Sequence, residues 1–339
     1  MESISHAPAE SSSSAASSTQ HNIWIEAQDE LKQKLIAQDD FPWRLATTAP
    51  TLHQEKEIAL KYVGGADISY SKQDPSMACG TLVVLDIHTL QVVYENHSVV
   101  TLSVPYVPGF LAFREAPVLL ELLEKMKASA TLFYPQLLMV DGNGILHPRG
   151  KSFDTNLCST YACPLVYEAK DFSVGFGLAC HLGILANLPT IGIGKNSAIF
   201  QLHHVDGLTL SGVRQLLKAK EDCAEDFVTL TGCSGRTWGV AMRSTDGCVK
   251  PIFISIGHRI SLDTAVKIVK MTCKYRMPEP IRQGPATILL HHSVCNVRVS
   301  VQTWSSLQWF ASSTINSVRS ENPDINRTGS PCLLRKMHI

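Results

Sequence analysis

The hydrophobic and polar positions of the chain alternate in ways that predict both strands and helices. Three early segments rich in β-branched residues, 63–70, 80–87 and 91–100, are typical of strands. Short apolar runs predict further strands at 136–140, 190–194, 226–230, 238–242 and 251–256. Apolar residues at helical spacing predict helices at 23–39, 117–126, 176–188 and 261–274.

The order of these elements predicts the fold class and the domain limits. Three consecutive strands followed by alternating helices and strands imply one mixed α/β domain, with helices on both faces of a sheet. We place this single domain at 23–283, with a polar connection at 40–60. Residues 1–22 are rich in Ser and Ala, so we expect disorder there. Residues 284–339 show no sustained period and predict a poorly ordered tail.

Composition and charge narrow the class of protein only slightly. The chain has 339 residues, with 30 Lys and Arg against 30 Asp and Glu, and a neutral total does not exclude a nucleic-acid partner. The ten Cys form no paired CxxC motifs, which favours reduced thiols in an intracellular protein. We find no apolar segment typical of a signal peptide at the N-terminus, and no run of apolar residues long enough to span a membrane. We therefore expect no membrane partner, a cytoplasmic or nuclear location, and a monomer.

Three acidic residues occupy positions that are typical of a metal site. Asp67 lies inside the apolar strand 63–70, where a carboxylate is costly to bury unless it is paired or metal-bound. Asp141 follows the strand 136–140, and α/β proteins often place their sites at such strand ends. Glu115 follows a loop rich in Pro and Gly. Because Mg²⁺ prefers oxygen ligands, these acids predict a site for one or two ions that polarise a phosphate and generate hydroxide.

Most of these candidates also have a simpler structural interpretation. Asp141 stands in DGNG, which is good turn chemistry, and Glu115 suits a helix N-terminus. His258 is our candidate to orient or deprotonate the attacking water, but it also suits a hydrogen-bonded core position. Asp67 is the exception, since no turn or cap explains it. Lys195, after the strand 190–194, could neutralise a phosphate beside the acids.

A stiff loop and a basic helix face point to nucleic acid. Pro105 and Pro108 flank Tyr106, and a rigid exposed aromatic can stack on a base or wedge into a stack left by a flipped nucleotide. The alternative is an aromatic that folds into its own loop. Three lysines share one face of the predicted helix 261–274 and could contact phosphates, or could form an ordinary solvated face; they are Lys267, Lys270 and Lys274.

Seven segments of the sequence, taken together, resemble the endonuclease V family. They are VGGADISYS (63–71), VPYVPGFLAFREAP (104–117), LMVDGNGILHPRG (138–150), FGLACHLGILANLPTIGIGKN (176–196), LHHVDG (202–207), ISIGHRIS (254–261) and YRMPEPIRQ (275–283). They occur in the family's order, and the joint match is far more specific than any single segment. The resemblance implies a ribonuclease H-like fold, a mixed sheet flanked by helices. It also implies dependence on Mg²⁺, with Mn²⁺ as a substitute.

The resemblance also implies a reaction and the residues that perform it. The family cleaves the second phosphodiester bond 3′ to inosine or deoxyinosine, so the expected partner is single- or double-stranded nucleic acid containing that base. The implied metal ligands are Asp67, Glu115 and Asp141, with His258 and Lys195 at catalytic positions. Tyr106, between Pro105 and Pro108, matches the strand-separating wedge. The backbone of four residues matches the base pocket, and these are Gly109, Leu111, Gly177 and Leu178. We also expect His147 and Arg149 to contact the substrate.

The chain departs from the family pattern in two inserts and in its tail. Residues 151–175 separate HPRG from FGLACHLG, and 197–201 separate GKN from LHHVDG. Codons resembling splice sites can encode the insert borders, so retained intron sequence is one hypothesis. The first insert enters beside Gly177, so it is either a tolerated surface loop or a disruption of the pocket. Three functions stay open: an inosine-specific endonuclease, an inosine-binding protein with impaired catalysis, and a ribonuclease H-like nuclease without base preference.

Overall fold

The computed structural model describes residues 11–45, 58–129, 132–147, 175–195, 209–220, 226–232, 235–245, 247–248, 250–284 and 300–301. Nine strands of these residues form one sheet, in the order β11-β5-β4-β3-β6-β7-β10-β9-β8. Its first part is the predicted antiparallel trio of β3 (Tyr62–Tyr70), β4 (Met77–Asp86) and β5 (Val92–Thr101). The short β11 (Ser300–Val301) pairs with β5 in parallel.

The centre of the sheet is parallel and its other edge is antiparallel. β6 (Leu137–Asp141) pairs in parallel with β3 and with β7 (Thr190–Gly194). β10 (Ile252–His258) then runs antiparallel to β7, followed by β9 (Thr237–Met242) and β8 (Phe227–Thr231). β6 and β7 are almost entirely buried, which explains their continuous apolar sequences.

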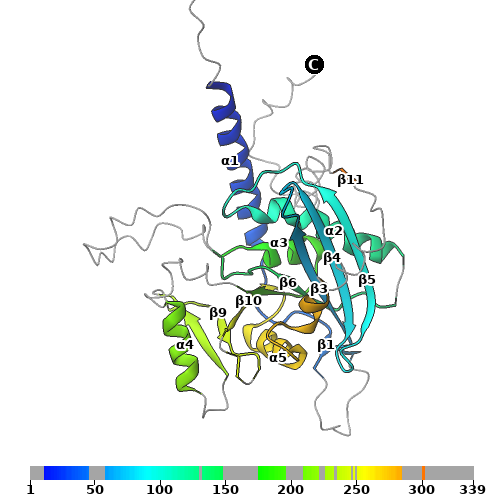
Figure 1. Cartoon of the computed structure of the whole chain (residues 1–339), viewed down its shortest axis with the longest axis vertical. Helices are drawn as coiled ribbons and strands as arrows, with labels where there is room; N and C mark the ends of the chain where they lie inside the picture. Colours follow the sequence, from blue (N-terminus) through cyan, green and yellow to red (C-terminus); the bar gives the residue numbers. More distant parts are fainter. Residues whose placement is uncertain are drawn as a thin grey trace, which may run out of the picture. The chain divides into compact units, whose positions relative to one another are not determined.

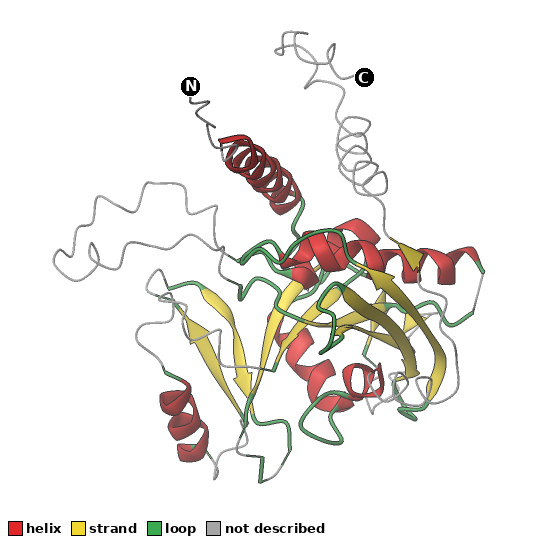
Figure 2. Cartoon of the chain, turned by 45° about the horizontal axis from the view of Figure 1, so that its top comes forward, coloured by secondary structure: helices red, strands yellow, loops and turns green. Residues whose placement is uncertain are grey.

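Helices cover both faces of the sheet (Figure 1; Figure 2). α2 (Leu111–Ala128) and α3 (Leu178–Ala186) lie together on one face, and α1 (Ser11–Gln33) contacts α3. α5 (Leu262–Thr272) packs on the other face against β10. The prediction of a mixed α/β sheet flanked by helices is therefore confirmed. Within the described residues, no helix is long and apolar enough to cross a membrane.

Two helices begin earlier than the sequence predicts. α1 begins at Ser11, inside the segment 1–22 that we expected to be disordered, and it ends at Gln33 rather than near residue 39. Ser and Ala have only a small free-energy cost in a helix, so they can extend a helix whose apolar face packs against the rest of the protein. α2 begins at Leu111 and contains Pro117, which we had placed at a helix start. Burial of Ala112 and Ala116 stabilises the added turn and overrides the local cost of the proline.

Four short elements were not predicted, and one of them, β11, lies in the segment 284–339 that we expected to be a poorly ordered tail. α4 (Leu210–Ala219) begins at the N-cap Thr209, whose side chain accepts a hydrogen bond from Gly212 N at 3.1 Å. That cap, with apolar residues at helical spacing, is a signal the sequence contains. β1 (Trp43–Arg44) and β2 (Ile58–Ala59) form a parallel pair in the segment predicted as a polar connection, and two-residue strands leave no periodic pattern to detect.

Candidate active site

The strand register brings Asp67 and Asp141 together. β3 and β6 are parallel, and Ala66 pairs with Val140, so the next residue on each strand is one of these acids. Because side chains alternate along a strand, both carboxylates leave the same side of the sheet near the carboxyl ends of their strands. Asp67 is buried, with 7% of its surface exposed. Gly284 closes over this side, since a Cβ there would lie 3.9 Å from the Asp67 Cβ.

Glu115 reaches the same region from α2. It is buried, and its Oε1 accepts a hydrogen bond of 2.6 Å from the hydroxyl of Tyr70, at the end of β3. Arg114 lies over the Tyr70 ring, with its guanidinium carbon 5.1 Å from the ring centroid. Sequence reasoning missed Tyr70, although it stands three residues after Asp67 in the quoted segment VGGADISYS. The hydroxyl fixes the orientation of Glu115 and ties α2 to β3.

Burial and mutual repulsion raise the pKa values of Asp67 and Glu115. Burial, followed by the charge of Asp141 and a hydrogen bond shared with it, raises the pKa of Asp67 to about 7. Burial also raises the pKa of Glu115 to about 7, although the Tyr70 hydrogen bond opposes that shift. The negative charges therefore exceed the positive charge that the protein places among them.

Lys195 supplies positive charge at this end of the sheet. Its Nζ contacts Asp141 Oδ2 directly, and its attraction partly opposes the rise in the Asp67 pKa. The placement of Lys195 beside the acids agrees with the expectation from its position after β7. Arg276 holds this strand end, because its Nη2 donates to the carbonyls of Lys195 and Pro251 at 2.6 and 3.2 Å.

The acid group fits a divalent cation by its chemistry. Three carboxylates, on β3, β6 and α2, lie in a largely buried setting with fewer cations beside them, Lys195 at Asp141 and Arg114 at Glu115. Hard oxygen donors of this kind suit Mg²⁺ or Mn²⁺. Among the described residues, no three His, Cys, Asp or Glu side chains already surround one point as a metal would require. Asp141 contacts Lys195 instead, so ion binding requires that carboxylate to exchange partners.

His258 does not join the acid group, which corrects the expectation from the sequence. β10 runs antiparallel to β7, and His258 pairs with Thr190 at the start of β7, whereas Lys195 follows the end of that strand. The His258 Nδ1 accepts a hydrogen bond from Ile36 N at 3.3 Å, and burial lowers its pKa to about 4. His258 is therefore a core histidine, which was the simpler interpretation, because strand direction places it at the opposite end of the sheet.

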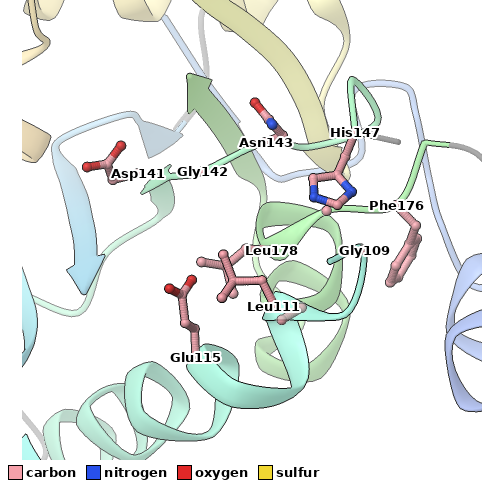
Figure 3. Close-up of a pocket in the computed structure, with 11 residues that line it drawn as sticks. Gly109, Leu111, Glu115, Asp141, Gly142, Asn143, His147, Phe176 and Leu178 are labelled. Carbon is pink, nitrogen blue, oxygen red and sulfur yellow. The ribbon is translucent and has the colours of Figure 1, made fainter. Parts of the chain in front are cut away.

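A pocket with a volume of about 140 Å³ opens beside the acids (Figure 3). This volume is well above the roughly 10–15 Å³ that a single water needs. Glu115 and Asp141 line it on the acid side (Figure 3). The other lining residues include His147 and all four members of the predicted base pocket, which are Gly109, Leu111, Gly177 and Leu178. The structure thus brings the expected base pocket and two of the acids into one cavity.

Helix N-termini supply hydrogen-bond donors to this pocket. Leu111 and Leu178 are the first residues of α2 and α3, and N–H groups at that position have no partner within their own helix. The Gly177 N–H is already used, because it donates to the carbonyl of Gly144 at 3.0 Å. Gly177 therefore forms part of the wall rather than a donor. A Cβ at Gly177 would lie only 2.3 Å from the Asn143 carbonyl oxygen, so only glycine fits there.

His147 contributes a largely enclosed imidazole to the pocket wall. Burial lowers its pKa to about 4, so the ring is neutral near pH 7. Its Nδ1 has no hydrogen-bond partner among the residues that the structure describes. A buried polar atom of this kind is costly unless a ligand or water satisfies it. Arg149, the other expected contact, lies outside the described residues.

Tyr106 has the exposure that a wedge requires. It is 64% exposed, and the two prolines beside it, Pro105 and Pro108, are exposed as well. This contradicts the alternative of an aromatic folded into its own loop. The loop leads directly into Gly109 and α2, so the exposed ring and the pocket lie on one continuous segment.

The first insert lies almost entirely outside the described residues, which stop at His147 and resume at Gly175. Gly175 N donates to the carbonyl of His147 at 2.8 Å, so the chain leaves and returns at adjacent positions. His147 on one side, and Phe176 and Gly177 on the other, line the same pocket. The insert therefore does not separate the walls of the pocket. The second insert, 197–201, lies outside the described residues.

The lysine face of α5 is only partly available for phosphate. Lys267, Lys270 and Lys274 are all exposed, but the Lys270 Nζ contacts Asp226 Oδ2 at 2.9 Å. The ion pair commits this lysine to a contact between α5 and the residue that precedes β8. Phosphate contact stays a prediction for Lys267 and for Lys274, which follows the end of α5 at Thr272.

Comparison with known proteins identifies the family of the chain. The Endonuclease V family model matches residues 45–174 and 172–285. Mouse endonuclease V is 38% identical over 263 residues, which cover 78% of this chain and 67% of the mouse protein. Human endonuclease V is 37% identical over 263 residues, which cover 78% of this chain and 80% of the human protein.

Solved structures lead to the same family. The catalytic domain of human endonuclease V superimposes with a TM-score of 0.63 at 35% identity, covering 81% of this chain and 96% of that domain. Endonuclease V of Ciona intestinalis, in complex with a 23mer DNA that contains an inosine followed by a ribo-adenosine, gives a TM-score of 0.62 at 31% identity. That match covers 81% of this chain and 98% of the Ciona chain. The chain is an endonuclease and belongs to the endonuclease V family.

Proposed function

We propose that this endonuclease cleaves the second phosphodiester bond 3′ to inosine in RNA or deoxyinosine in DNA, with Mg²⁺ or Mn²⁺ as cofactor. One observation carries the proposal: Glu115 and Asp141 line the same cavity as the residues expected to hold the base. A flipped base in that cavity would bring its neighbouring phosphates close to the acids. The inosine-containing DNA bound by the Ciona relative supports the choice of base.

The cavity can distinguish hypoxanthine from adenine by its backbone groups. Hypoxanthine presents O6 as an acceptor and N1–H as a donor, whereas adenine presents the reverse. The N-terminal N–H groups of α2 and α3, at Leu111 and Leu178, would donate to O6. A carbonyl of the wall would accept from N1–H. Adenine would leave these buried groups unpaired, which is a strong basis for rejection.

The acids and Lys195 have complementary roles in phosphoester hydrolysis. Asp67, Glu115 and Asp141 would hold the divalent cation, which polarises the phosphate and activates water. Tyr70 keeps Glu115 oriented through its hydroxyl. When Asp141 turns to the cation, the ammonium of Lys195 becomes free to neutralise a phosphate oxygen. Tyr106 would enter the stack at the flipped nucleotide and keep the strand open.

The test is cleavage of end-labelled single-stranded RNA and DNA, each with one inosine, in Mg²⁺, Mn²⁺ or EDTA. We expect one cut, one nucleotide beyond the inosine on its 3′ side, and none in EDTA. The same oligonucleotides with adenosine at that position serve as the control. Equal cutting of the inosine and adenosine substrates would contradict base selection and favour a ribonuclease H-like nuclease without base preference.

A second candidate function is inosine binding with impaired catalysis, because the insert 151–175 borders the cavity at His147 and Phe176. Deleting 151–175 joins Gly150 to Phe176 and provides the comparison. We expect the full chain and the deletion variant to cut at rates within about tenfold, since loop closure costs grow slowly with loop length. The second candidate function would be favoured if the full chain binds inosine RNA without cleaving it and the deletion variant does cleave it.

A further inference from the structure

The inner face of α1 contains one buried polar residue among apolar ones. Trp24, Gln28 and Leu31 lie at positions i, i+4 and i+7 of the helix, which form one face. The Trp24 ring stacks on Phe113 of α2, with centroids 5.3 Å apart and planes at 14°. Leu31 is 2% exposed and Gln28 is 3% exposed. An amide in such a place is costly unless its polar atoms are satisfied.

Gln28 satisfies its amide with two carbonyls of the pocket wall. Its Nε2 lies 3.4 Å from the oxygen of Gly109 and 3.4 Å from that of Phe176. An amide nitrogen has two hydrogens, so both contacts can be donated at once. Gly109 and Phe176 both line the pocket, and they lie side by side on it (Figure 3). They belong to segments far apart in sequence, the loop before α2 and the turn before α3.

The two segments need such a link because each enters its helix through an irregular backbone. Gly109 has φ of +83° and Gly175, just before Phe176, has φ of +89°. Neither helix has a side-chain N-cap, since Phe110 and Gly177 occupy those positions. The donors expected to read the base, at Leu111 and Leu178, follow directly. The separation of Gly109 from Phe176 therefore sets the separation of these two donors.

We propose that Gln28 is a positioning residue for base selection: it links the Gly109 and Phe176 carbonyls and so holds the two helix N-termini at the spacing that hypoxanthine requires. This inference deepens the proposed function and rests on it. It also gives α1 a role in recognition, although no part of α1 is among the lining residues of the cavity. Trp24 would anchor the helix, while Gln28 would align the wall.

The test compares Gln28→Met with a matched change on the same helix, Gln33→Met. Methionine keeps the length of the side chain but cannot donate, and Gln33 is exposed at the end of α1. The measurement is the binding preference, the ratio of dissociation constants for adenosine and inosine oligonucleotides. We expect Gln28→Met to reduce this preference about tenfold, the effect of losing two neutral hydrogen bonds, and Gln33→Met to leave it unchanged.

A second variant and a second measurement separate positioning from stability. Gln28→Glu has the same shape but directs a carboxylate at two carbonyls, so its preference should fall at least as far as that of Gln28→Met. Hydrogen exchange of the 109–112 and 176–178 amides should be faster in both variants below their melting temperatures. Lower melting temperatures with an unchanged preference and unchanged exchange in these segments would overturn the proposal and leave Gln28 as a stabilising residue only.

The same experiment keeps this inference apart from the proposed function. A wild-type chain with no preference for inosine contradicts the proposed function, and the inference falls with it. A wild-type chain that prefers inosine, together with a Gln28→Met chain that prefers it equally, contradicts only the inference.

Discussion

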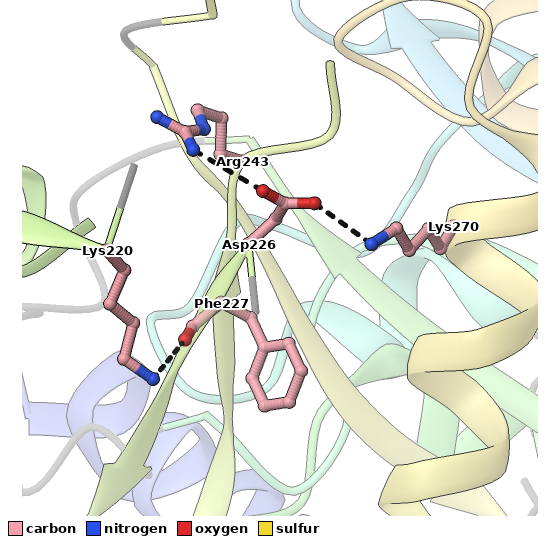
Figure 4. A network of polar contacts seen from close by, with 5 residues as sticks. All are labelled: Lys220, Asp226, Phe227, Arg243 and Lys270. Atoms are coloured by element: carbon pink, nitrogen blue, oxygen red, sulfur yellow. Dashed lines mark hydrogen bonds and ion pairs between the residues drawn. The ribbon is translucent and has the colours of Figure 1, made fainter. Parts of the chain in front are cut away.

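Two groups of charged residues in this protein have opposite charge balance. At the carboxyl ends of β3 and β6, the three carboxylates of Asp67, Glu115 and Asp141 outnumber the cations beside them. Lys195 contacts Asp141 and acts on Asp67, and Arg114 acts on Glu115. Before β8, the single carboxylate of Asp226 meets two cations (Figure 4), Lys270 Nζ at 2.9 Å and Arg243 Nη2 at 3.4 Å. The pKa values of Asp67 and Glu115 are raised, whereas the Lys270 hydrogen bond lowers the pKa of Asp226.

The difference in charge balance distinguishes a candidate functional site from a cluster of charges that stabilises the structure. The Asp226 group is complete as it stands, and it links α5 to the sheet edge, where Lys220 Nζ also donates to the Phe227 carbonyl at 3.2 Å (Figure 4). The acid group has an excess of buried negative charge, which destabilises the fold and favours the binding of a cation. Sites that keep such an imbalance exchange stability for function.

The largest expected effect comes from neutralising the acid group at its centre. Asp67→Asn should reduce cleavage of inosine RNA by about 1000-fold or more, because a metal ligand supplies several kcal/mol of transition-state stabilisation. Oligonucleotide binding in Ca²⁺ should stay within about threefold of wild type. Asp226→Asn is the matched control, and it should cut at the wild-type rate. Metal-dependent cleavage by Asp67→Asn at a comparable rate would refute the assignment of this carboxylate as a ligand.

Removing the cation that contacts Asp141 should have an intermediate effect. Lys195→Met should lower kcat by about 10- to 100-fold, since the phosphate loses a charged partner. It should also strengthen Mg²⁺ binding, because the ammonium no longer competes for Asp141. Titration of Mg²⁺ against the cleavage rate gives both quantities. Weaker Mg²⁺ binding in Lys195→Met would mean that the lysine supports the ion rather than competes with it.

The two groups should also differ in how pH changes their contribution to stability. A carboxyl with a raised pKa binds more protons in the folded state, so its contribution to the free energy of unfolding falls as pH rises from about 4 to about 7. In EDTA, Asp67→Asn should therefore match wild type only below about pH 4, exceed it slightly at pH 5 and melt a few °C higher at pH 8. Thermal melts across this range measure it, and saturating Mg²⁺ should remove the advantage. A variant that melts lower than wild type at pH 8 would show that the acid group is not strained.

The smallest expected effect is at the structural group. Asp226→Asn should lower the free energy of unfolding by about 0.5–1 kcal/mol, because partly exposed ion pairs contribute little. Urea denaturation gives this value, and 1 M salt should reduce the difference further. A loss above roughly 3 kcal/mol would indicate that the contact between α5 and the sheet edge depends on this carboxylate far more than the geometry indicates.

Much of the fold was readable from local pattern. β7 was predicted with its observed bounds, and the N-cap Ser261 begins α5 as expected, its side chain accepting from Thr264 N at 3.2 Å. The first residues of α1 and α2, Ser11 and Leu111, could not be predicted from the local sequence. Packing against the core decides how far a marginal helix extends. The bounds 23–283 for the domain and the nature of 284–339 stay predictions.

The sequence by itself determined which residues are candidates for the chemistry. A carboxylate on an apolar strand, an acid at a strand end and a proline-flanked tyrosine are local signals, and they identified Asp67, Asp141 and Tyr106. Only the tertiary structure decided which of them meet. The parallel register of β3 and β6 joined the two acids, while the antiparallel direction of β10 carried His258 to the other end of the sheet. Strand pairing joins segments that are far apart in sequence, so no local pattern encodes it. The hydrogen bonds from Gln28 to the pocket wall likewise became visible only in the folded chain.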